Sequence, residues 1–313
     1  SILAQITTVM MLFIDAYMVG HLGAEASASI GLVESTTWLM GSVMSAASMG
    51  FSVQVSHFIG ANDFFKARQV FRHGLLCGLA FSLIIAAIGT SIHSVLPLWL
   101  GGGNDINHDA SQYYLVFSLT MPFILLFHLS ASMIKCSGNM QLPSLMSVLL
   151  CVLDVIFNYL FIYMLHLGVV GAAIGTSMAY ISTSLPIAWM ATRRNKILAL
   201  QLDNVPFKWV WDYVTKAIRI SLPMAIQSVL MSGAQIVSTL IVAPLGNIAI
   251  ASNSFAITAE SLCYMPGYGI GDAATTLVGQ TYGAGRKDLC KSFAHMTVGL
   301  GMLVMAFMGL IMY

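Results

Sequence analysis

Long apolar runs separated by short polar breaks fill this chain from end to end. A helix that crosses a membrane needs about 20 mostly apolar residues, and each of these runs reaches that length. The pattern therefore predicts an all-α membrane protein with about nine transmembrane helices. We expect them near residues 1–21, 27–59, 68–99, 111–135, 143–166, 169–192, 213–244, 248–281 and 288–313.

Composition leads to the same class. Of the 313 residues, 58% are hydrophobic and 8% are charged, and mean hydropathy is +0.85. Soluble domains carry about 25% charged residues, so a soluble fold this poor in charge could not cover its surface. The five cysteines are scattered, and no pair has metal-ligand or redox spacing, so we expect neither a zinc site nor a disulfide framework.

The basic residues fix an orientation. All 13 Lys and Arg residues lie in or beside the even-numbered connections between the predicted helices. Because positive charge gathers on the cytoplasmic side, the N-terminus is predicted to be cytoplasmic, in a multi-pass protein of the plasma (inner) membrane. The polar segment 101–112, which has no basic residue, is expected to be an extracytoplasmic loop.

The chain also repeats itself. Moved from position 22 to position 245, a shift of 223 residues, it aligns without a gap: Leu22-Gly23 meets Leu245-Gly246, and Gly60-Ala61 meets Gly283-Ala284. Six predicted spans separate the copies, so the repeats run parallel, which is typical of transporters that bind substrate between two halves. A complete twofold repeat would have twelve helices, and we expect this chain to be a fragment lacking the last three. The predicted domains are an N-lobe at 1–192, a cytoplasmic linker at 193–212 and a partial C-lobe at 213–313.

Four segments resemble motifs of the multidrug and toxic compound extrusion (MATE) family, in particular its bacterial members. They are Asp15–Gly23 (DAYMVGHLG), Gly138–Pro143 (GNMQLP), Gly168–Thr176 (GVVGAAIGT) and Val278–Gly285 (VGQTYGAG). The resemblance implies twelve helices in two six-helix lobes. It also implies export of organic cations and drugs in exchange for protons or sodium ions.

Acidic residues inside the predicted spans are candidate functional groups, because a carboxylate in lipid is costly. At 1.5 Å per residue, Asp15, Asn158 and Thr176 come out roughly 10–12 Å from the outer surface, and Asp154 nearer 18 Å. Oxygen-bearing groups from three helices thus share the outer half of the first lobe, where they could hold a proton or a hard cation. The other candidates, for lining or gating the cavity, are Glu34, Glu260 and Asp272.

The resemblance assigns roles to these positions. It implies that Asp15 is the ion-coupling carboxylate and that Asp154, Asn158 and Thr176 complete the cation-coupling site. The helix-five pair reads Asp then Asn, whereas other members can carry the reverse order, so the coupling ion stays open between H⁺ and Na⁺. Sodium-coupled members with a C-lobe site carry a Glu where this chain has Met231, so no such site is expected.

We therefore predict a secondary antiporter that exports small organic cations or drugs by alternating access. It would be a monomer in the lipid bilayer, with no cofactor, no catalytic residue, no nucleic-acid partner and no metal beyond Na⁺ at the coupling site. A lipid-linked oligosaccharide flippase of the same superfamily is the main alternative, although it would need cations in its cavity to bind pyrophosphate. A membrane-embedded enzyme or a receptor is a more distant one.

Overall fold

A computed structural model describes residues 2–202 and 207–312, and within these ranges the chain is helical and has no strand. Residues 203–206, part of the predicted linker, lie outside the described residues. Within the described residues, nine long helices follow the predicted runs, which confirms the all-α membrane fold. The elements are α1 (Ile2–Gly20), α2 (Ala24–Gly60), α3 (Phe64–Ile92), α4 (Leu96–Trp99), α5 (Asn104–Cys136), α6 (Gln141–Asn158), η1 (Tyr159–Met164), α7 (Gly168–Trp189), η2 (Met190–Arg194), η3 (Leu200–Leu202), α8 (Trp211–Val242), η4 (Ala243–Leu245), α9 (Asn247–Gly283) and α10 (Lys287–Met312).

Six of the described helices are both long and apolar enough to cross a membrane on their own, and Gln5–Gly20 is a shorter apolar helix. The long helices α2 and α9 are less apolar. Helix α2 packs against α5, α8 and α9, and it buries many serines in these contacts. Small polar residues suit helix–helix contacts inside a membrane, which accounts for the serines that α2 buries.

Two predicted boundaries near 100 are wrong. The third helix ends at Ile92, not near 99, and is followed by the short α4, which has Pro97 in its first turn, where the missing N–H of proline is tolerated. The fifth helix in the structure begins at Asn104, so most of segment 101–112 is helical and not a loop. Gly101, at φ +80°, forms the turn between α4 and α5. Asp105 in the first turn of α5 is favourable at the positive N-terminal end of that helix.

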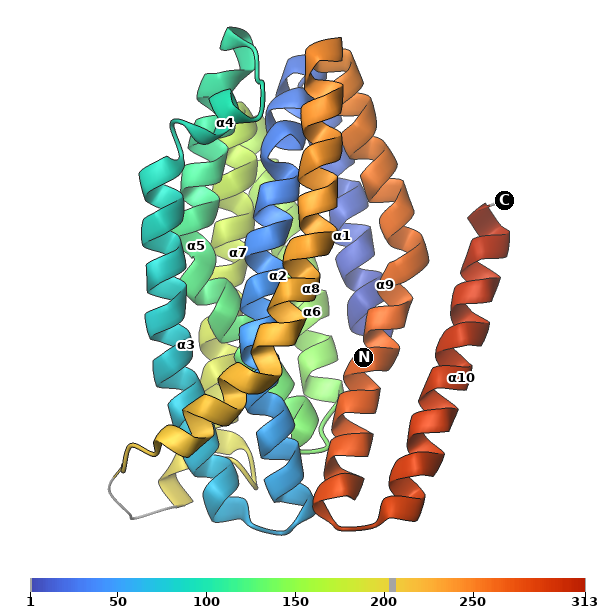
Figure 1. Cartoon of the computed structure of the whole chain (residues 1–313). Coiled ribbons are helices and arrows are strands. Elements are labelled where there is room, and N and C mark those ends of the chain that lie inside the picture. Colours follow the sequence, from blue (N-terminus) through green and yellow to red (C-terminus); the bar gives the residue numbers. More distant parts are fainter. Residues whose placement is uncertain (1, 203–206, 313) are drawn as a thin grey trace.

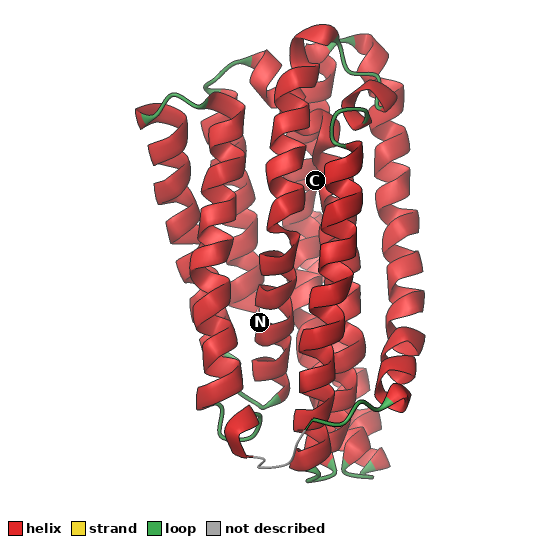
Figure 2. Cartoon of the chain, turned by 90° about the vertical axis from the view of Figure 1, so that its left-hand side faces the viewer, coloured by secondary structure: helices red, strands yellow, loops and turns green. Residues whose placement is uncertain are grey.

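The helices stand side by side along one direction, with α2 in the interior and α10 at one edge beside α9 (Figures 1 and 2). Below, the first-repeat helices are α1–α7 and the second-repeat helices are α8–α10.

Helices α2 and α9, which are copies under the shift of 223, contact each other reciprocally. A Cβ added to Gly60 would fall on the carbonyl oxygen of Gln280, and one added to Gly283 would fall on that of His57. These four positions are related by the repeat shift, 57 to 280 and 60 to 283. Reciprocal contacts of this kind are what a twofold relation produces, so the two copies meet along a pseudo-twofold axis parallel to the helices.

Candidate functional site

Three helices bring the predicted coupling residues together. Asn158 at the end of α6 donates from Nδ2 to Oδ1 of Asp15 on α1 (2.8 Å) and to Oδ2 of Asp154 (3.1 Å). The Asp154 carboxylate also lies close to Asp15 and to Thr176 on α7. The four residues thus form one cluster, called the acidic cluster below.

The acidic cluster has unused oxygen atoms. Asp154 and Asn158 are 0% and 1% exposed, and Asp15 is partly exposed. Oδ1 of Asp154 and Oδ1 of Asn158 are buried and have no hydrogen-bond donor among the residues that the structure describes. A buried acceptor without a donor costs about 1–3 kcal/mol, so an added proton or hard cation would satisfy it. The residues present therefore fit either H⁺ or Na⁺ as the bound ion.

A glycine and a change of helix type position Asn158. A Cβ on Gly175 of α7 would fall on Oδ1 of Asn158 and lie 2.9 Å from its backbone nitrogen, so only glycine allows α6 and α7 to approach this closely. Directly after Asn158 the helix becomes the π-helix η1, a feature often found at functional sites. From η1, the Tyr163 hydroxyl donates to the Met18 carbonyl oxygen at 2.8 Å and joins this segment to α1. Sequence reasoning missed the π-helix, because nothing in Tyr159–Met164 departs from an ordinary apolar run.

The other acidic candidates lie outside the acidic cluster. Glu34 on α2 accepts a hydrogen bond from Ser254 on α9, and Asp272 on α9 forms an ion pair with Lys135 on α5 (Nζ to Oδ2 2.5 Å). Both contacts join first-repeat to second-repeat helices. Glu260 is exposed. The sequence pattern predicts neither of these two contacts.

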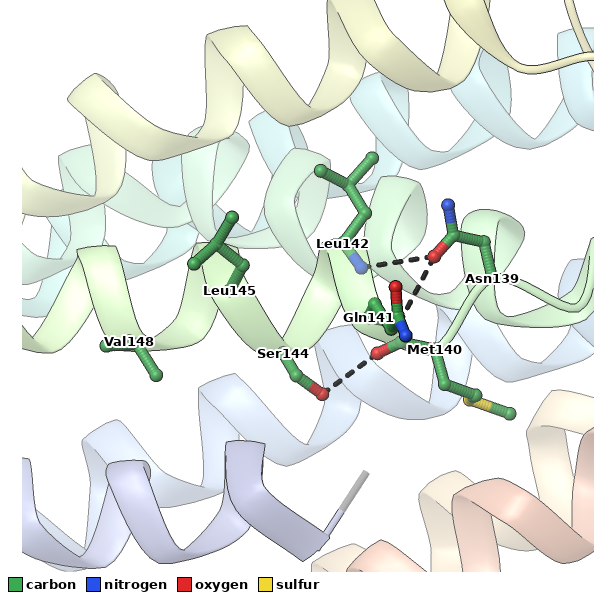
Figure 3. Close-up of a pocket in the computed structure, with 7 residues that line it drawn as sticks. All are labelled: Asn139, Met140, Gln141, Leu142, Ser144, Leu145 and Val148. Carbon is green, nitrogen blue, oxygen red and sulfur yellow. Dashed lines mark hydrogen bonds between the residues drawn. The ribbon is translucent and has the colours of Figure 1, made fainter.

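Two grooves lie near these elements. One of about 670 Å³ is lined by residues Asn139–Leu142, Ser144, Leu145 and Val148 at the start of α6, and Figure 3 shows Oδ1 of Asn139 accepting from two backbone N–H groups there. It contains none of the candidate residues. A smaller groove of about 300 Å³ lies at the end of α1, where Tyr17 and His21 face Phe255 of α9. Neither of these two grooves is lined by a residue of the acidic cluster, and the smaller one opens between a first-repeat and a second-repeat helix.

Comparison with known proteins gives the family. The family profile described as MatE matches residues 1–160 and 223–313, the two copies of the repeat. The chain belongs to the MATE family. Among its MATE relatives, a probable multidrug resistance protein NorM of Thermotoga maritima is 26% identical over 88% of this chain and 59% of its own length. The corresponding protein of Pseudomonas syringae pv. tomato is 25% identical over 99% and 68%. The chain thus spans about three fifths to two thirds of the length of these relatives.

The fold of a solved MATE transporter agrees with this family assignment. A structure described as the outward-facing conformation of a multidrug resistance MATE family transporter superposes with a TM-score of 0.88. It covers 97% of this chain and is 21% identical to it, while the chain covers 67% of that structure. The helical arrangement is therefore that of a MATE transporter, and the chain is a multi-pass membrane protein.

Proposed function

We propose that this chain forms the ion-coupling part of a multidrug antiporter, in which binding of H⁺ or Na⁺ at the acidic cluster drives export of organic cations or drugs. Two relatives carry the name of multidrug resistance proteins, which supports the substrate class. The observation that carries the proposal is the set of two carboxylates and an amide, Asp15, Asp154 and Asn158, meeting deep in the helix bundle with two acceptor oxygens unused. Thr176 completes the set.

The mechanism follows from where these residues lie. The carboxylates of Asp15 and Asp154 lie close together, and two negative charges at such a short distance repel each other. A bound cation or proton therefore stabilises the contact between α1 and α6. Loss of the ion leaves like charges adjacent and favours separation of α1 from α6. Since α1 also borders α9 at Phe255, a shift of α1 changes the space between the two copies of the repeat. Ion binding would thereby alter access to substrate, as alternating access requires.

The same proposal covers topology and assembly. We place the protein in the plasma (inner) membrane with the N-terminus in the cytoplasm, as a monomer with an N-lobe at 1–192 and a partial C-lobe at 213–313. The protein needs no cofactor and acts as a transporter, not an enzyme.

Transport by the protein reconstituted in proteoliposomes tests the coupling. With an imposed proton or sodium gradient, Asp15→Asn should slow gradient-driven ethidium movement by about tenfold or more, in line with the 5–150-fold range of coupling effects. Glu25→Gln is the matched control, because Glu25 is an exposed carboxylate in the first turn of α2. Gradient-driven ethidium movement at the wild-type rate in Asp15→Asn would refute the proposal.

A further inference from the structure

Glu34 lies where the two copies of the repeat touch. It is ten residues into α2, about 15 Å from the start of that helix. The Ser254 hydroxyl of α9 donates to its Oε2 at 2.5 Å, and the Trp38 side chain, one turn further along α2, lies close to the carboxylate. One turn earlier, a Cβ on Gly31 would lie 2.9 Å from Cβ of Ser254. The carboxylate is therefore held at a point of close contact between a first-repeat and a second-repeat helix.

The contacts of Glu34 supply no positive charge. Among the described residues, the ion pairs are Lys66 with Asp63, Lys135 with Asp272, and Lys216 with Asp212, and none includes Glu34. Its hydrogen-bond donor, the Ser254 hydroxyl, and the nearby Trp38 indole are both neutral. A carboxylate inside a membrane protein is stabilised by a cation much more than by neutral donors. In the part of the chain that the structure describes, the Glu34 carboxylate has no such cationic partner.

Three aromatic side chains lie near the carboxylate. Besides Trp38, Tyr113 lies within electrostatic reach of Glu34 as well as of Asp15, and Tyr264 of α9 lies within reach of both Glu34 and Glu260. The faces of such rings attract organic cations, whose charge is spread over apolar groups. One buried carboxylate and rings from three helices form a combination that suits an organic monocation better than a hydrated metal ion.

We infer that Glu34 is the counter-charge for the cationic group of an organic cation bound between the two copies of the repeat, where that group takes the place of the Ser254 hydroxyl. Ser254 belongs to the opposite copy, so movement of α9 away from α2 breaks its bond and frees the carboxylate oxygen. Tyr113 lies within electrostatic reach of both this site and the acidic cluster. The inference rests on the proposed export of organic cations, and it adds where their charge is bound.

Equilibrium binding without any ion gradient tests this inference separately from transport. The protein in nanodiscs is titrated with tetraphenylphosphonium, a permanent cation, and with triphenylphosphine oxide, an uncharged molecule of related shape. Glu34→Gln should weaken tetraphenylphosphonium binding by about tenfold or more and leave triphenylphosphine oxide binding within about twofold, because truncating one partner of a buried charge pair costs at least 2 kcal/mol. Glu34→Asp, which keeps the charge, should bind the cation more tightly than Glu34→Gln does.

Ser254→Ala is the matched control, since it removes the same inter-helix hydrogen bond and leaves the carboxylate. It should bind tetraphenylphosphonium at least as tightly as the wild type. Unchanged cation binding in Glu34→Gln would overturn the inference, and so would an equal loss for the cation and the neutral molecule, or an equal loss of cation binding in Ser254→Ala. A failure of gradient-driven transport in Asp15→Asn with normal tetraphenylphosphonium binding would support separate coupling and substrate sites.

Discussion

The ion pair between Lys135 and Asp272 should contribute more to stability than any other ion pair in the described part of the chain. It joins α5 to α9, and its side chains are only 15% and 26% exposed. Next to it, Gln280 of α9 donates to the Cys136 carbonyl oxygen at 2.8 Å. Removing one member of a fully buried pair costs about 3–5 kcal/mol, and exposed pairs contribute about 0–1 kcal/mol. For this intermediate exposure we expect Lys135→Met or Asp272→Asn to lose about 2–3 kcal/mol of unfolding free energy.

A double-mutant cycle isolates the interaction. The variant with both substitutions should lose clearly less than the sum of the two single losses, with a coupling energy of about 1.5–2 kcal/mol. The matched pair within the chain is Lys216 with Asp212, which are 57% and 60% exposed on one helix and should couple by no more than about 0.5 kcal/mol. Unfolding by SDS in dodecyl maltoside micelles, followed by tryptophan fluorescence, measures both cycles. Equal coupling energies in the two cycles would refute the reasoning from burial.

Two further variants test local geometry. Gly175→Ala should displace the Asn158 side chain, because the new Cβ falls on its Oδ1, and should reduce gradient-driven ethidium transport about tenfold or more. Gly299→Ala, at an open position on α10, should leave this transport unchanged. Normal transport in Gly175→Ala would show that Asn158 need not be held there. Asp63→Ala should cost about 1 kcal/mol, since Asp63 caps α3 through the Lys66 N–H. The hydrogen bond from the Lys66 side chain holds the pKa of Asp63 below its usual value, so this stabilisation is fully present above the unfolded pKa of about 3.9 and is lost as pH falls through the lower folded pKa. A difference between wild type and Asp63→Ala that persists unchanged at pH 2 would contradict it.

Apolar runs, basic residues and the repeat together predict this fold well, because each long run can be satisfied only by a helix in lipid. The ends of the helices are harder to predict from the sequence. Asn104 and Asp105 are polar and were assigned to a loop, yet an acidic residue in a first turn stabilises a helix start. The break after Ile92 is marked by the polar residues His93 and Ser94 and by Pro97, which the pattern of long apolar runs leaves out of account.

For the site, the i, i+4 spacing of Asp154 and Asn158 and the depths of Asp15 and Thr176 were enough to predict one layer, and the structure places these side chains in contact. Their role in coupling stays a prediction. Contacts across the repeat could not be derived in the same way. The bond from Ser254 to Glu34 depends on the rotation of α9 about its axis, which hydrophobic periodicity does not fix when small residues cover several faces of the helix.

The contacts between the copies of the repeat occur at both ends of α9. Asn247 in its first turn donates to Oδ2 of Asp105 at 3.0 Å, and Gln280 near its other end bonds to Cys136. Because α5 supplies the partners at both ends, loosening one end of α9 leaves the other end fastened to the same helix. A bundle fastened in this way can open to one compartment without becoming a continuous water-filled path. Such a bundle would not leak ions across the membrane, which is a condition of the proposed antiport.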